Sequence, residues 1–167
     1  MRITLAIVVP LAAALIQSAI APLISIAGAF PHLPLLAAAS WSVAVGAGEG
    51  LWWAFVGGLA LDVLSAGPLG AFTVSALPGT LMVGIGDRSA ARPIPVLTGV
   101  AAVFLAVLLT QVLYLGILSL LGHPSVSAGP ALFAQTVGVG IYTGALALVV
   151  YPLARAGRRL TEQESPF

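Results

Sequence analysis

Long runs of apolar residues fill most of the chain, and short segments rich in proline, glycine or charge separate them. A helix that crosses a bilayer needs about 20 apolar residues, and a shorter helix is tolerated where the bilayer thins or where the helix lies deep in a bundle. The pattern predicts six spans, at about residues 3–27, 35–45, 51–64, 71–85, 94–121 and 131–153. We expect an all-α integral membrane protein with one transmembrane domain, residues 1–160, and a short disordered polar tail, residues 161–167.

The composition supports this interpretation and excludes several other classes of protein. Of the 167 residues, 60% are hydrophobic and 7% are charged, whereas about a quarter of the residues in an ordinary soluble domain are charged. A net charge of +1 leaves no basic surface of the kind that binds nucleic acid. The chain has no cysteine, which excludes disulfides and thiol chemistry.

The arginines predict the orientation, because cytoplasmic segments of membrane proteins carry an excess of basic residues. If residues 35–64 form two short helices, all the arginines fall on one side of the membrane; one long helix would divide them between both sides. We therefore expect six spans with both termini in the cytoplasm, and external loops that contain His32, Pro68 and His123. The cytoplasmic set is Arg2, Arg88, Arg92, Arg155, Arg158 and Arg159.

Small residues recur at every fourth position of two spans, and such ridges let membrane helices pack closely. In the third span we expect a seam for helix packing or for a partner, widened by Gly57 and formed by Gly46, Gly50, Ala54, Gly58, Asp62 and Ala66. The first span has an edge that could dock a partner helix or pack within the bundle, and the sequence leaves both open. This edge consists of Ala6, Pro10, Ala14, Ser18 and Pro22.

Asp62 is the charged residue that most needs an explanation, because an intramembrane carboxylate is costly unless it is paired, hydrated or neutralised. The simplest interpretation is a structural brace that accepts hydrogen bonds from the following turn or from the N-terminus of the fourth helix. Partner contact and ligand or proton binding are the alternatives. We expect Glu49 and Asp87 to be solvated or paired with arginine at the surface, and Trp52 and Trp53 to lie at the membrane interface.

The remaining polar residues do not suggest an enzyme. Gln111 and Gln135 are expected to be buried amides that bridge helices. His32 and His123 stand in separate loops without a second ligand at metal spacing, and the chain has no nucleophile motif or phosphate-binding loop. We therefore expect no catalytic residue, no metal and no cofactor.

Residues 50–70 resemble a stretch that is typical of the rod shape-determining protein MreD family. The matching positions are Gly57, Gly58, Leu59, Asp62, Ser65, Pro68, Leu69 and Gly70. Pro78 and Gly79 depart from the family pattern and are expected to interrupt the fourth span. The resemblance implies a multi-pass protein of the bacterial inner membrane that binds MreC, a protein with one membrane helix and a large external domain. It also implies a scaffold that helps to couple cytoplasmic MreB filaments to the peptidoglycan synthases penicillin-binding protein 2 and RodA.

A second class of protein fits the same outline. The substrate-binding S components of energy-coupling-factor vitamin transporters are also small six-span bundles, and the expected fold is similar to theirs. An S component would need polar and aromatic side chains that converge near the external face. The candidates are Asp62, His32, His123, Tyr114 and Gln135.

Overall fold

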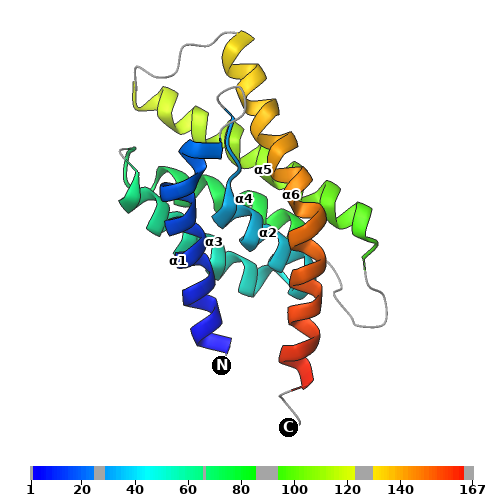
Figure 1. The fold of residues 1–167 in the computed structure, drawn as a ribbon. Helices are drawn as coiled ribbons and strands as arrows, with labels where there is room; N and C mark the ends of the chain where they lie inside the picture. The colour runs from blue at the N-terminus through cyan, green and yellow to red at the C-terminus, as the bar shows by residue number, and fades with distance from the viewer. Residues whose placement is uncertain (1, 25–28, 66, 86–93, 123–129, 164–167) are drawn as a thin grey trace.

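The computed structural model describes residues 2–24, 29–65, 67–85, 94–122 and 130–163. Within these residues the chain forms six α-helices and one 3-10 helix, and no β-strand (Figure 1). The elements are α1 (Arg2–Ile20), η1 (Ala21–Ile24), α2 (Leu33–Val45), α3 (Ala47–Leu64), α4 (Ala71–Gly84), α5 (Val96–Leu120) and α6 (Pro130–Gln163). The predicted all-helical class is confirmed.

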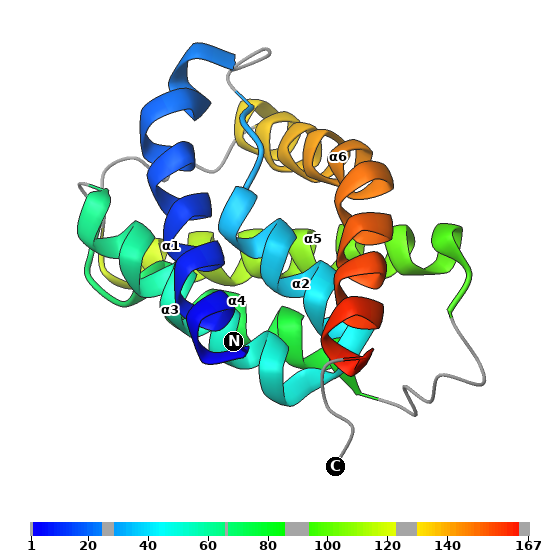
Figure 2. The same cartoon turned by 60° about the horizontal axis from the view of Figure 1, so that its bottom comes forward.

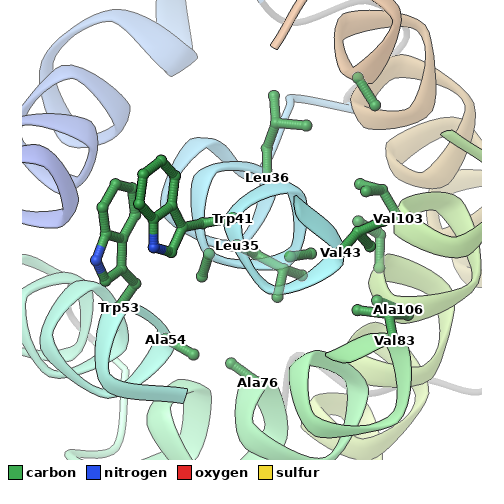
Figure 3. Close-up of a cluster of buried hydrophobic side chains, with 14 of the residues drawn as sticks. Leu35, Leu36, Trp41, Val43, Trp53, Ala54, Ala76, Val83, Val103 and Ala106 are labelled. Atoms are coloured by element: carbon green, nitrogen blue, oxygen red, sulfur yellow. The ribbon is translucent and has the colours of Figure 1, made fainter. Parts of the chain in front are cut away.

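The short helix α2 occupies the centre of the bundle (Figure 3). It contacts every other α-helix, and its buried residues run almost continuously from Pro34 to Ala44. A helix that is apolar on all sides either faces lipid or is buried by other helices, and the contacts of α2 show that it is buried. Its 13 residues extend for only about 20 Å, so α2 serves as the core around which the longer helices pack.

The ends of α1 and α2 differ from the prediction. α1 ends at Ile20 and continues as the 3-10 helix η1, instead of extending to residue 27. Pro22 has no N–H to donate to an α-helical bond, which explains the change at this point. α2 begins before Pro34, which lies in its first turn. Proline is tolerated there because the N–H groups of the first turn have no acceptor within the helix.

A single residue separates α2 from α3, and the expectation of two helices rather than one is confirmed. Gly46 has a φ of 135°, a backbone conformation that other residues rarely adopt, and it turns the chain between the helices. The predicted break from Gly46 to Gly50 was too long, because Gly48, Glu49 and Gly50 already belong to α3.

Two prolines lie inside helices. α4 runs through Pro78 without a break, so the expected interruption at Pro78 and Gly79 is wrong. A Cβ on Gly79 would lie 2.7 Å from the carbonyl oxygen of Ala106, so the glycine lets α4 and α5 pack closely. α6 contains Pro152 and bends along its length (Figure 2), as helices do at proline. α6 also extends to Gln163, so residues 161–163 are helical and not a disordered tail; residues 164–167 lie outside the described residues.

Two helices in the described part of the chain are long and apolar enough to cross a membrane, Val96–Leu120 and Ala134–Arg159. Three other helical stretches, in α1, α2 and α4, are apolar but shorter. The outer surface carries large apolar side chains on several helices, including Val8, Leu105, Val112 and Leu148, each more than half exposed. The N-terminal end of α1 and the C-terminal end of α6 lie at the same end of the bundle (Figure 1). Six membrane spans and a cytoplasmic location of both termini stay predictions.

Candidate functional site

Asp62 lies at the end of α3 and caps the beginning of α4. Its two carboxylate oxygens accept hydrogen bonds from the backbone N–H groups of Phe72 and Thr73, each at 3.0 Å, and the Thr73 hydroxyl donates to the same carboxylate. The side chain is 2% exposed. These N–H groups belong to the first turn of α4 and have no partner within that helix, and the carboxylate also favours the positive end of the helix dipole. These hydrogen bonds are the ones that the interpretation of Asp62 as a structural brace requires.

The turn that follows explains why the cap comes from another helix. Gly70 occupies the N-cap position of α4 with a φ of 87°, so the residue that would ordinarily supply a capping oxygen has no side chain. Ser65 ends α3, and its hydroxyl accepts a hydrogen bond from the N–H of Gly67. Pro68 accepts a bond from the N–H of Ala71, while Leu69 is 75% exposed at the tip. Asp62 and this turn therefore act as one structural unit that joins α3 to α4.

The small-residue seam of α3 is filled by helices of the same chain. A Cβ on Gly50 would clash with the Ser42 side chain in α2, and a Cβ on Gly58 would lie 2.8 Å from the Cα of Thr73 in α4. Gly57 faces Pro34 of α2 and Pro10 of α1. Ala54 is buried as well, and Ala66 lies outside the described residues. The seam thus packs the bundle and offers a partner little free surface.

The edge of α1 is divided between the bundle and the outside. Pro10 and Ala14 are buried, Ala6 is partly buried, and Ser18 is exposed with its hydroxyl bonded to its own helix. Gln17 is buried and accepts a hydrogen bond from the N–H of Leu33 at 2.9 Å. The sequence did not indicate this contact. The side chain of Pro22 is not described.

His32, which was expected in an external loop, is the N-cap residue of α2, and its side chain is buried at 8% exposure. Its N–H donates to the hydroxyl oxygen of Thr143, and its ring Nε2 lies 3.2 Å from Oε1 of Gln111. The ring of Phe72 is 5.2 Å away. These partners come from α5 and α6, far along the chain, so the sequence did not reveal the burial of His32. Gln111, which was expected to be a buried amide that bridges helices, is partly buried and contacts His32 at the start of α2.

Gln135, the two tryptophans of α3 and Glu49 have surroundings that differ in part from those expected. Gln135 is exposed and not buried, although it has an interaction within the structure. Trp53 is buried and stacks on Trp41 with the ring centroids 4.7 Å apart, while Trp52 is half exposed. Glu49 accepts a hydrogen bond from the Trp41 indole N–H at 3.0 Å. His123 and Asp87 lie outside the described residues.

Two of the arginines fasten helices together at the end of the bundle where α6 ends. Arg158 donates to the carbonyl oxygen of Ala44 at 2.8 Å, in the last turn of α2, where free carbonyls and the helix dipole favour a cation. Arg155 donates to the carbonyl oxygen of Ile94 at 3.2 Å, just before α5. Arg159 is exposed. The Arg2 side chain is not described, and Arg88 and Arg92 lie outside the described residues.

An apolar groove of about 440 Å³ runs between α1 and α3 on the outside of the bundle. Its lining consists of apolar side chains alone: Leu11, Leu15, Phe55, Val56, Leu59, Ala60, Val63 and Leu64. Phe55, Leu59 and Val63 are 42%, 44% and 67% exposed. The sequence did not reveal this groove, because the pattern of small residues lies on the opposite, inward face of α3.

The described residues contain no group of three His, Cys, Asp or Glu side chains that could hold a metal ion. Of the side chains considered for a vitamin-binding S component, Asp62, His32 and Tyr114 lie around Phe72. However, the Asp62 carboxylate is occupied by α4, and Gln135 is exposed. The S-component alternative is therefore not favoured.

The family model of the rod shape-determining protein MreD matches residues 1–156 of the 167-residue chain. Comparison with curated proteins and with solved structures gives no match. The matched family is a shape-determining, membrane-associated structural family and not a known enzyme family. Because the match covers nearly the whole chain, this protein belongs to the MreD family and has a role in determining rod cell shape.

Proposed function

We propose that this protein is a non-enzymatic scaffold of the bacterial cell-elongation machinery, embedded in the inner membrane, where it binds an MreC-like protein. The observation that carries the proposal is the family match over residues 1–156. Most of the described residues lie in the helical bundle, which fits a membrane platform whose partners supply the soluble domains. Through MreC the scaffold would connect indirectly to MreB filaments, penicillin-binding protein 2 and RodA.

The groove between α1 and α3 is the proposed seat for the single membrane helix of the MreC-like partner. Helices in lipid associate by close packing rather than by a hydrophobic driving force, so a concave surface with a small residue in its lining favours association. Ala60 is this small residue, and larger apolar side chains such as Leu15 and Val63 stand beside it. The seam of glycines inside the bundle is already filled, which leaves this outer groove as the better candidate.

Affinity purification tests the proposal. A tagged full-length copy is extracted from native membranes in mild detergent, and every co-purifying protein is identified by mass spectrometry. We expect a protein with one membrane span and a large external domain. Recovery of two ATPases and a transmembrane coupling subunit would instead contradict the scaffold and point to a transporter.

A matched pair of variants locates the contact. Ala60→Leu adds bulk to the groove, and Ala101→Leu makes the same change at an exposed position of α5 away from it. We expect Ala60→Leu to reduce recovery of the partner several-fold and Ala101→Leu to leave it unchanged. Equal recovery of the partner with both variants, when both variants elute as intact bundles, would show that the groove is not the partner's binding site.

A further inference from the structure

A small pocket at the arginine-rich end of the bundle combines two cationic side chains with apolar walls. It has a volume of about 260 Å³ and is lined by Val96, Pro152, Arg155, Ala156 and Arg159. These residues come from the first turn of α5 and the last third of α6. The groove proposed for the partner helix lies between α1 and α3 and shares no residue with this pocket.

The pocket lies where the two longest apolar helices end. Val96 is the first residue of one candidate span, and Arg159 is the last residue of the other. The spans contain 25 and 26 residues, which corresponds to about 38 Å of helix each at 1.5 Å per residue. This length exceeds the hydrocarbon core of about 30 Å, so the helix ends reach the headgroup layer, where lipid phosphates lie.

Contacts within the bundle hold Arg155 in place. It donates from Nη1 to the carbonyl oxygen of Ile94 at 3.2 Å, and its guanidinium carbon lies 5.9 Å from the centre of the Tyr151 ring. The Tyr151 hydroxyl donates to the same carbonyl oxygen at 3.4 Å. A guanidinium has several N–H donors, so this anchoring leaves others free to bind an anion. The contacts therefore hold the Arg155 guanidinium in position, with N–H groups available to an anion.

Arg159 follows Arg155 by one helical turn, so the two side chains lie on the same face of α6. Among the described side chains, the structure gives neither arginine a carboxylate partner. Arg158 differs, because it points to the carbonyl of Ala44 in α2. The pocket is thus a site of concentrated positive charge next to the beginning of α5, where the helix dipole adds to the positive potential.

The apolar part of the lining indicates which phosphate compound fits. Pro152, Ala156 and Val96 form the apolar walls, and the neighbouring Leu97 is 77% exposed. A free phosphate ion would gain nothing from these walls, whereas a phospholipid would place its phosphate at the arginines and its acyl chains along the apolar surface. We propose that this pocket binds the phosphodiester headgroup of an anionic phospholipid.

Native mass spectrometry of the purified full-length protein tests this site. The protein in mild detergent is titrated with phosphatidylglycerol and, separately, with phosphatidylcholine of identical acyl chains. Arg159→Gln removes one of the two cations at an exposed position and is expected to preserve the fold. We expect wild-type protein to retain phosphatidylglycerol in preference to phosphatidylcholine, and Arg159→Gln to weaken phosphatidylglycerol binding roughly tenfold.

Two controls separate a specific site from general surface charge. Arg159→Lys keeps the charge and is expected to retain most of the binding, whereas Arg158→Gln removes a neighbouring charge outside the pocket and is expected to retain the lipid preference. Equal losses with Arg159→Gln and Arg158→Gln, or no loss with Arg159→Gln, would overturn the proposal. Displacement of the lipid by millimolar inorganic phosphate, with no preference between the two lipids, would assign the pocket to a free anion and also overturn it.

Discussion

At the scale of single residues, the roles of polar side chains depend on which neighbours the fold supplies. The hydrogen bonds of Asp62 to the start of α4 were predictable, because the carboxylate lies one turn before a Gly–Pro turn and the next helix begins immediately afterwards. The burial of His32 was not predictable, because its partners, Gln111 and Thr143, lie 79 and 111 positions away in the chain. Local spacing carries no information about such pairs.

Loss of the Asp62 carboxylate should destabilise the α3–α4 unit. Asp62→Ala leaves two backbone N–H groups and a hydroxyl without their acceptor, and we expect it to lower the free energy of unfolding by about 1–3 kcal/mol. Asp62→Asn keeps one acceptor oxygen and should have a smaller effect. Thermal unfolding of the purified proteins in detergent measures both. Variants as stable as the wild type would show that the cap contributes nothing to folding.

At the scale of helices, the approximate positions of the elements followed from the apolar runs, but several ends did not. α6 was expected to end at residue 153 because arginines follow, yet it continues to Gln163. Arginine is a good helix former, so the arginines after residue 153 mark the end of the apolar span and not the end of the helix. Similarly, the central position of α2 could not be predicted, because apolar composition alone does not distinguish a lipid-facing helix from a buried one.

The close approach of α3 and α4 depends on Gly58. Gly58→Ala would place a Cβ 2.8 Å from the Thr73 Cα, a backbone atom that cannot move alone. We expect a loss of about 1–3 kcal/mol in the free energy of unfolding, which is typical of overpacking.

Gly116→Ala is the matched control for this variant. Gly116 lies within α5, and a Cβ there meets nothing within 4 Å. Alanine is the better helix former, so this change should be neutral or stabilise the protein slightly. Denaturation of both variants in the same detergent gives the comparison. Equal stability of the two variants would show that α3 and α4 do not pack through Gly58.

At the scale of the whole molecule, the expected class is confirmed and the expected family is shown, while the membrane topology is still a prediction. The composition indicated a membrane protein, because so few charges cannot cover a soluble particle, and the matched family is membrane-associated. The family was recognisable because the Asp62 unit, with its turn from Ser65 to Gly70, is a local feature of the chain. The α1–α3 groove was not recognisable, since two separate helices form it.

The six-span topology predicts opposite locations for the two ends of α3. The chain has no cysteine, so Gly48→Cys and Leu69→Cys each create a single thiol at an exposed position. With intact spheroplasts, a membrane-impermeant maleimide should label Leu69→Cys, while Gly48→Cys should react only after permeabilisation. Labelling of both variants from the outside, or the reverse pattern, would contradict the proposed orientation.

The most direct test of the scaffold account is photocrosslinking in living cells. A photoreactive amino acid at Val63 lies in the groove, and the same amino acid at Val112 of α5 is a matched exposed position away from it. The account predicts that Val63, and not Val112, crosslinks to a protein with one membrane span and a large external domain. Crosslinks from Val63 to lipid alone, or equal protein crosslinks from both positions, would contradict the claim that this groove seats the partner.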